Sequence, residues 1–255
     1  ADTITPMLHL RPADPVWQRR ARRLLELAET RWMGRNERGQ LQFKSTYFNA
    51  ETVDPDPRKA CDTVYHPRVL QPVLLLWQRT GDAHLGRLVL DWMDTWVDAA
   101  TRAENGKPAG IIPSAIHWPD GAIGGTTGSW WDPGNHDDDP LYVWPSAMRI
   151  LLNTLLLCYH QSGRRHYLNP LFSMAAIFRR YGTADGEAAP GSAAWCARRM
   201  PPFLLPALAK YRQLSGDTQF DDLIRRKGDG YQRLLLGDGR AELLADLQEQ
   251  VEALR

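Results

Sequence analysis

One local pattern recurs three times along the chain: an apolar helical stretch, a short turn that contains glycine, and a second, amphipathic stretch. The three copies span 66–100, 142–182 and 201–236. Glycine takes the left-handed conformation that ends a helix at little steric cost. The glycines that follow the first stretches are Gly81, Gly163 and Gly216. The pattern therefore predicts successive helical hairpins.

Two further helical segments flank these hairpins. A stretch over Asp14–Met33 begins with a capping aspartate and carries an apolar stripe opposite a face rich in arginine. The end of the chain is amphipathic with an acidic surface, as in a capping helix. We predict one all-α domain over 1–255, with the hairpins in 14–236 and a C-terminal helix or tail in 237–255.

Two long segments interrupt the helical pattern, at 34–65 and 101–142. In a chain of hairpins, both would connect the end of one unit to the start of the next, so both would lie on the same side of the helices. Long connections without regular structure are uncommon in compact domains and often carry function. We therefore expect the functional residues in these two linkers.

The repeated units resemble those of the six-hairpin, or (α/α) toroid, carbohydrate-active enzymes, over roughly Asp14 to Leu236. The resemblance implies alternating inner and outer helices and an active-site cleft built from long loops at one rim. It also implies glycoside hydrolase or polysaccharide lyase activity. A complete toroid needs more helices than the pattern predicts here, so we expect either a partial barrel or a part of a larger barrel.

The composition argues against several kinds of partner. The formal net charge is +1, which gives no basic surface of the kind that binds nucleic acid. No apolar run approaches the roughly 18 residues that span a bilayer. The three cysteines have no zinc-site spacing, and we predict no cofactor. The excess of arginine over lysine suggests a GC-rich bacterial genome, and we favour a secreted or periplasmic protein.

Aromatic side chains are concentrated in the linkers. The chain has ten tryptophans, and several lie among glycines and prolines, where a flat sugar face is a common partner for an indole ring. Packing at the mouth of the barrel is the alternative, above all for Trp144. The predicted substrate-binding residues are Tyr47, Trp118, Trp130, Trp131, Asp132, His136 and Trp144.

Four residues are candidates for catalysis: Tyr65, His66, His117 and Asp120. A polysaccharide lyase removes the C5 proton of a uronic acid with a His or Tyr base, while a glycosidase needs two carboxyl groups. Lysine or arginine would neutralise the uronate carboxylate. Asp120 also suits a simple turn, and each histidine suits a structural hydrogen bond.

The leading hypothesis is therefore an enzyme that cleaves an oligo- or polysaccharide in an aromatic-lined cleft, as a hydrolase or a lyase. One alternative is a non-catalytic helical-repeat domain that binds or scaffolds a partner. Another is a sugar epimerase or isomerase, which would use paired histidines in the same cleft. The acidic run at 137–139 could bind calcium through oxygen ligands, although it lacks the EF-hand spacing.

Overall fold

The structure is a computed structural model that describes residues 1–134, 140–183 and 186–253. It is mainly helical, with 58% helix and 8% strand, which confirms the all-α class. Among the described residues, no helix is both long enough and apolar enough to cross a membrane. The helices are α1 (Ile4–Leu10), α2 (Pro15–Leu27), α3 (His66–Val69), α4 (Gln71–Thr80), α5 (Ala83–Thr101), α6 (Met148–Ser162), α7 (Asn169–Tyr181), α8 (Ala193–Arg199), α9 (Pro201–Ser215), α10 (Asp221–Lys227), α11 (Gly230–Leu234) and α12 (Arg240–Ala253).

The three predicted turns are confirmed. Gly81, Gly163 and Gly216 have φ values of 65°, 69° and 73°, and each backbone N–H closes the last turn of the preceding helix. Helix α4 packs on α5, and α9 packs on α10, as expected for hairpins. Helix α6 leads into a short 3₁₀ segment, η4 (Arg165–Leu168), which contacts both α6 and α7.

The first predicted helix is shorter than expected. Its start is as predicted, because the Asp14 carboxylate accepts a hydrogen bond from the Val16 N–H at 2.9 Å. Its regular part ends at Leu27 and is followed by a π-helical turn over Ala28–Trp32. The indole of buried Trp32 donates to the Asn49 carbonyl at 2.7 Å. This tertiary contact takes the chain out of the helix before Met33.

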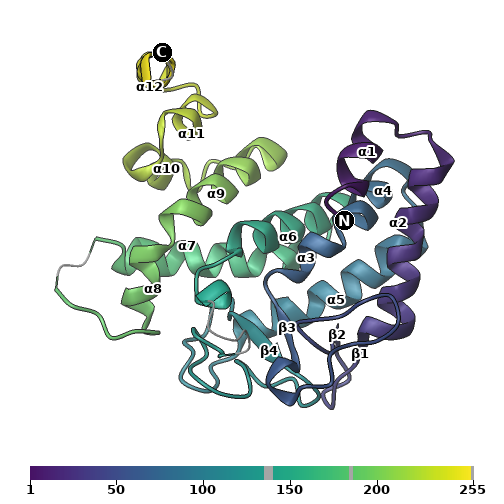
Figure 1. The fold of residues 1–255 in the computed structure, drawn as a ribbon. Coiled ribbons are helices and arrows are strands. Elements are labelled where there is room, and N and C mark those ends of the chain that lie inside the picture. Colours follow the sequence, from purple (N-terminus) through teal and green to yellow (C-terminus); the bar gives the residue numbers. More distant parts are fainter. Residues whose placement is uncertain (135–139, 184–185, 254–255) are drawn as a thin grey trace.

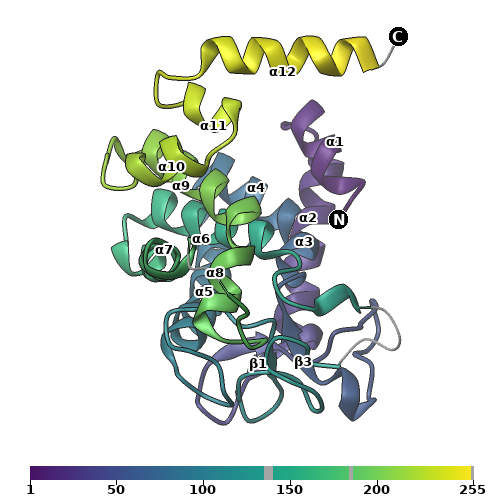
Figure 2. The same cartoon turned by 90° about the vertical axis from the view of Figure 1, so that its left-hand side faces the viewer.

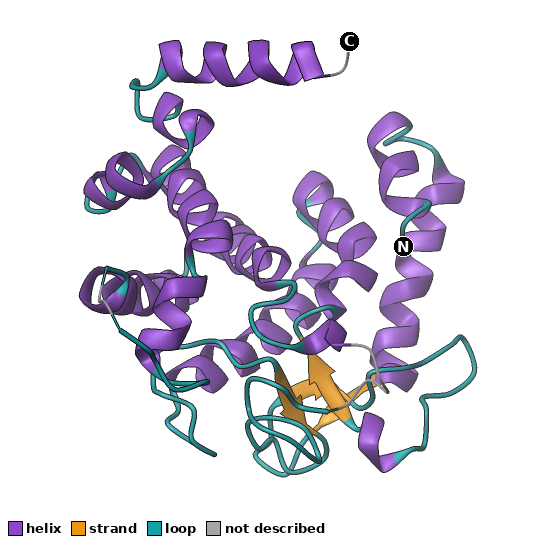
Figure 3. Cartoon of the chain, turned by 60° about the vertical axis from the view of Figure 1, so that its left-hand side comes forward, coloured by secondary structure: helices purple, strands orange, loops and turns teal. Residues whose placement is uncertain are grey.

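Both linkers contain short strands, which the sequence pattern does not predict. Strands β1 (Met33–Arg35) and β2 (Leu41–Phe43) form one antiparallel pair, and β3 (Cys61–Thr63) and β4 (Ala115–His117) form another. The second pair joins the two linkers, because β3 belongs to one and β4 to the other. Figures 1 and 3 show the strands and the surrounding loops together at one end of the helices.

Helix α5 lies at the centre of the packing. It contacts α4, α6, α7 and strand β2, and its Trp92 and Trp96 are fully buried. By contrast, α12 contacts α11 and stands apart from the other helices (Figures 1 and 2). Its Leu244, Leu247 and Val251 are exposed. The core of the domain therefore does not depend on α12.

A buried lysine in the second linker is hydrogen-bonded to the end of α5. Lys107 is only 2% exposed, and its ammonium group donates to the carbonyls of Ala100, Pro108 and Ile111 at 2.8–3.1 Å. Ala100 lies in the last turn of α5, where the helix leaves carbonyls unpaired. Burial lowers the pKa of Lys107 to about 8, although the charge of Glu104 opposes this change.

This pKa predicts a rise in stability at alkaline pH. Burial destabilises the folded state as long as Lys107 is charged, and this cost is complete below pH 8. It disappears as the buried lysine loses its proton and the pH rises towards the ordinary pKa of 10.5. We expect the free energy of unfolding to gain about 3 kcal/mol over that interval relative to Lys107→Met. Urea denaturation of both proteins with a reductant present would measure the difference. Parallel pH profiles would contradict the prediction.

Candidate functional site

The two linkers are joined side by side by hydrogen bonds in addition to the β3–β4 pair. The buried Gln42 side chain donates from β2 to the His117 carbonyl on β4 at 3.1 Å. The Trp118 N–H donates to the Ala60 carbonyl at 2.8 Å. Thr126 donates its hydroxyl hydrogen to the Pro57 carbonyl at 2.8 Å. The linkers thus form a single loop layer, defined here as residues 33–65 and 101–134.

The centre of this layer is the carboxylate of Asp62, which is fully buried on β3. It accepts hydrogen bonds from the indole of Trp92 at 2.7 Å and from the Phe43 N–H at 3.2 Å. It also lies 2.7 Å from Nδ1 of His66. These three partners come from α5, β2 and α3, so one side chain on β3 connects two helices to β2 of the first linker. Asp62 was not among the predicted site residues.

His66 is sealed inside the domain. Its ring is 4% exposed and stacks on Phe43, with 4.1 Å between the ring centroids. Nδ1 lies 2.7 Å from Oδ1 of Asp62 and also 3.1 Å from the Thr63 nitrogen, whose N–H points at it, so two partners meet this one ring nitrogen. Nε2 and the Thr63 hydroxyl are both buried and have no hydrogen-bond partner among the described residues. As it stands, His66 is closed to a substrate.

The strand register separates the two candidate histidines. Cys61 pairs with His117 and Asp62 pairs with Ile116, and paired residues of an antiparallel sheet share a face. Neighbouring residues point to opposite faces, so Asp62 and His117 lie on opposite sides of the β3–β4 pair. His66 contacts the Asp62 carboxylate and so lies on the same side of the pair as Asp62. The expected convergence of the two histidines in one hollow is therefore not observed.

The tyrosines of the prediction also lie in separate places. Tyr65, half-buried at the start of α3, meets the ring of Tyr142 edge to face at 5.4 Å. Tyr47 is exposed, and the ammonium group of Lys59 lies 5.1 Å from its ring centroid. Each ring therefore already contacts another side chain within the linkers.

His117 and Asp120 form a second imidazole–carboxylate pair, and this pair is open to solvent. Their side chains are 22% and 46% exposed, and Nδ1 of His117 lies 2.8 Å from Oδ1 of Asp120. Partial burial acts to raise the pKa of Asp120, but hydrogen bonds from the Ala122 N–H and from His117 hold it below its ordinary value. Asp120 is therefore ionised at neutral pH and orients the imidazole through Nδ1.

The turn that carries this pair, residues 117–121, packs along the β1–β2 hairpin. A side chain at Gly34 would clash with the Trp118 ring and with the Lys44 side chain, so both lie directly over that glycine. The Pro119 carbonyl accepts from the Glu37 N–H at 2.8 Å. Trp118 is half-buried, and Lys44 forms no ion pair with a described carboxylate. A cation and an indole thus lie beside the turn.

An ion-pair network holds the same turn in place. Arg38 donates to the Asp120 carbonyl at 3.0 Å and pairs with Glu104 at 2.8 Å. Arg102 also pairs with Glu104 and donates to the Gly121 carbonyl at 2.9 Å. Glu104 is thereby neutralised by two guanidinium groups. Glu104 therefore helps to hold the turn in place. Asp120, within the turn, is the more exposed of the two carboxylates.

Most of the predicted sugar-binding tryptophans pack against one another. Trp144 is 2% exposed and donates to the Ile112 carbonyl at 3.0 Å, and Trp130 is 4% exposed and contacts Trp144 edge to face. These two rings belong to the core, because neither leaves a face for a ligand. Trp131 is half-buried against Trp195, with 5.7 Å between the ring centroids.

A pocket of about 380 Å³ opens beside Trp131. Its wall is formed by the backbone of the glycine-rich segment 124–128, by Asn105 and by the edges of Trp130 and Trp131. Asp132 is exposed close by and pairs with Ser129 through backbone hydrogen bonds of 2.8 and 2.9 Å. The pocket begins at Ile123, which bridges to Ile116 on β4, so it adjoins the strand that ends in His117.

His136 and the acidic run at 137–139 lie outside the described residues, so their predicted roles in substrate and calcium binding stay predictions. Within the described part of the chain, no three His, Cys, Asp or Glu side chains are grouped as metal ligands. The described cysteines, Cys61, Cys158 and Cys196, are buried. Burial raises the pKa of Cys196 to about 12, so this thiol is not a reactive thiolate at neutral pH.

The two imidazole–carboxylate pairs should respond differently to the same substitution. Asp62→Asn removes the charge that three buried donors share, so we expect a loss of about 3 kcal/mol in the free energy of unfolding. Asp120→Asn, the matched control, should cost less than about 1 kcal/mol because this pair is exposed. Urea denaturation would test both variants. Equal losses of unfolding free energy in the two variants would show that the Asp62 pair is not structural or that the Asp120 pair is not open.

Comparisons of the chain with protein-family models, with curated proteins and with solved structures gave no match.

Proposed function

We propose that the domain binds an acidic polysaccharide at its loop layer and cleaves it by elimination at a uronic acid residue. The observation that carries this proposal is the open His117–Asp120 pair beside an indole and a lysine without an ion-pair partner among the described residues. A uronate-dependent lyase needs these functions: a base, a group that orients it, and a cation for the substrate carboxylate.

In this reaction His117 would act as the base. With Nδ1–H donated to Asp120, Nε2 can accept the C5 proton of the uronate. The bond between C4 and the glycosidic oxygen breaks as the C4–C5 double bond forms. The departing oxygen can take up the proton that His117 has received. Lys44 would bind the substrate carboxylate and stabilise the negative charge that develops on it.

Hydrolysis is less well supported by the same geometry. A glycosidase needs one carboxyl group that stays protonated to act as the acid. Asp120 has a lowered pKa, and Glu104 is paired with Arg38 and Arg102. Asp132 is exposed to solvent and lacks the apolar enclosure of a glycosidase acid. The sugar epimerase alternative expected paired histidines, but His66 and His117 lie on opposite faces.

The toroid-like arrangement belongs to the same proposal. The short helix α3, which precedes α4 in the first hairpin, contacts α6, and α6 contacts α9. The second helices are neighbours in the same order, since α5 contacts α7. An inner row beside an outer row supports an arc of a partial (α/α) barrel, with the loop layer at one rim.

The second candidate is a domain that binds a glycan without cleaving it. It is favoured by the separation of the predicted catalytic residues into a buried pair and an open pair. In this case the pocket beside Trp131 and the Trp118 ring would supply the contacts. The two candidates share the loop layer and differ in whether His117 performs chemistry.

A glycan panel would separate the candidates. We expect uronate-containing polymers to yield both new reducing ends and the ultraviolet absorbance of unsaturated uronates. His117→Ala should lower turnover by about a hundredfold or more, because a positioned base contributes at least that factor. The matched control is His166→Ala, which removes another histidine that lies 2.8 Å from an aspartate, Asp94.

Several outcomes would decide against cleavage by elimination. Reducing ends without the absorbance would indicate hydrolysis, and thermal protection by a glycan without any product would indicate binding alone. Full activity of His117→Ala would refute the placement of the base. Lys44→Met should raise KM for the uronate polymer and also lower kcat, because Lys44 binds the substrate carboxylate and stabilises the charge that develops on it in the transition state.

A further inference from the structure

A separate pocket of about 400 Å³ lies where α6 meets α9 and α11. Helices α9 and α11 lie on the side of the domain away from the strands and the loop layer, and α6 lies between them and the strands (Figures 1 and 2). Its floor is apolar and comes from side chains of α9 and from the residue that follows α11: Leu205, Pro206, Ala209 and Leu235. Tyr231 stands at the rim and is 59% exposed. The sequence pattern gave no reason to expect a site here.

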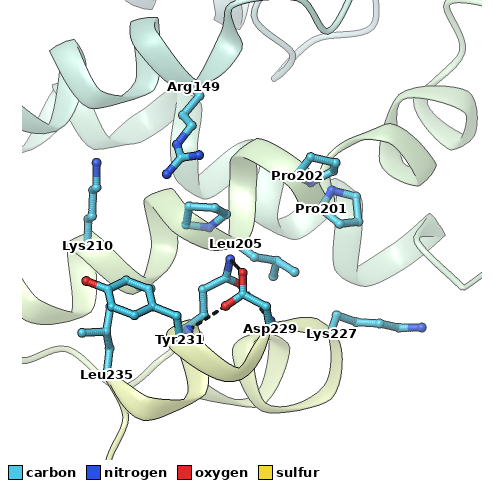
Figure 4. A pocket seen from close by; sticks show the side chains of 12 residues that line it. Arg149, Pro201, Pro202, Leu205, Lys210, Lys227, Asp229, Tyr231 and Leu235 are labelled. Carbon is cyan, nitrogen blue, oxygen red and sulfur yellow. Dashed lines mark hydrogen bonds between the residues drawn. The ribbon is translucent and has the colours of Figure 1, made fainter. Parts of the chain in front are cut away.

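Two cationic side chains lie on one side of this pocket. Arg149 extends from α6 and Lys210 from α9, and Lys227 points away from both of them (Figure 4). Among the described residues, Arg149 has no hydrogen-bond or ion-pair partner, and Lys210 donates only to the Asn153 side chain at 2.9 Å. The positive charge on this side is therefore not balanced by a neighbouring carboxylate.

The carboxylate that lines the pocket is occupied by its own helix. Asp229 caps the start of α11, and its two oxygens accept hydrogen bonds from the backbone and side-chain nitrogens of Gln232, both at 2.8 Å. Among the described residues it forms no ion pair with Arg149 or Lys210. Burial, and then the charge of Arg149, lower the pKa of Lys210, as expected for two cations that face each other without an anion.

We infer that this pocket binds a small amphiphilic anion, in which an apolar or aromatic body carries one carboxylate, sulfonate or phosphate group. The anionic group would lie between Arg149 and Lys210 and relieve their repulsion. The apolar body would cover the proline and leucine side chains of the floor, next to the Tyr231 ring. This site is independent of the proposed glycan chemistry, because the two share no residue.

Titration with the fluorescent probe anilinonaphthalene sulfonate tests the inference directly. We expect saturable binding that decanoate displaces and that uncharged decanol does not, since the cations select the charge. Arg149→Gln and Lys210→Gln should each weaken binding by about tenfold. The matched control, Lys227→Gln, removes one charge from the same pocket wall and should leave binding unchanged, because this side chain points away.

The outcomes that would overturn the inference are equally direct. Absence of saturable binding would refute the site, and so would displacement by decanol as strong as displacement by decanoate. Equal weakening by all three substitutions would show a general charge effect rather than a site. Arg149 and Lys210 are exposed, so unfolding is not an expected cause of lost binding, and circular dichroism would verify the fold. Inorganic phosphate alone should compete poorly because it lacks the apolar body.

Discussion

The arrangement of the loop layer depends on the buried carboxylate of Asp62. A charge without solvent is costly unless donors surround it, and here an indole, a backbone N–H and an imidazole all meet one side chain. Because Trp92 belongs to the central helix α5 and Phe43 to β2, the carboxylate sets the position of the first linker relative to the helices. The β3–β4 pair then sets the position of the second linker, and with it the turn of His117.

The helical framework could be predicted from sequence because its signals are local. A glycine after an apolar stretch and an aspartate before Val16 act on the backbone around them, and the structure has both features as predicted. The end of α2 could not be predicted in this way. It depends on Trp32 reaching the Asn49 carbonyl, a contact between residues that helical periodicity does not relate.

The candidate site was predicted only in part, for a similar reason. The pattern of long linkers correctly led to the region where the two segments meet, and the spacing of His117 and Asp120 suited their contact in a turn. Which face of a strand a residue occupies depends on register, and no local signal in a three-residue strand sets that register. Hence Asp62 was missed, and His66 was placed with His117. Trp130 was placed at a surface and packing was only one alternative for Trp144, because a loop position does not reveal the neighbouring indoles that bury a ring.

Amide hydrogen exchange of Asp62→Asn beside the unmodified protein tests the central role of this carboxylate most directly. If Asp62 organises the loop layer, exchange should accelerate together in β2, β3, β4 and the 117–121 turn. Protection in α6 and α9, which do not contact Asp62, should change much less. Faster exchange confined to the immediate neighbours of Asp62, or spread equally over all helices, would contradict the account.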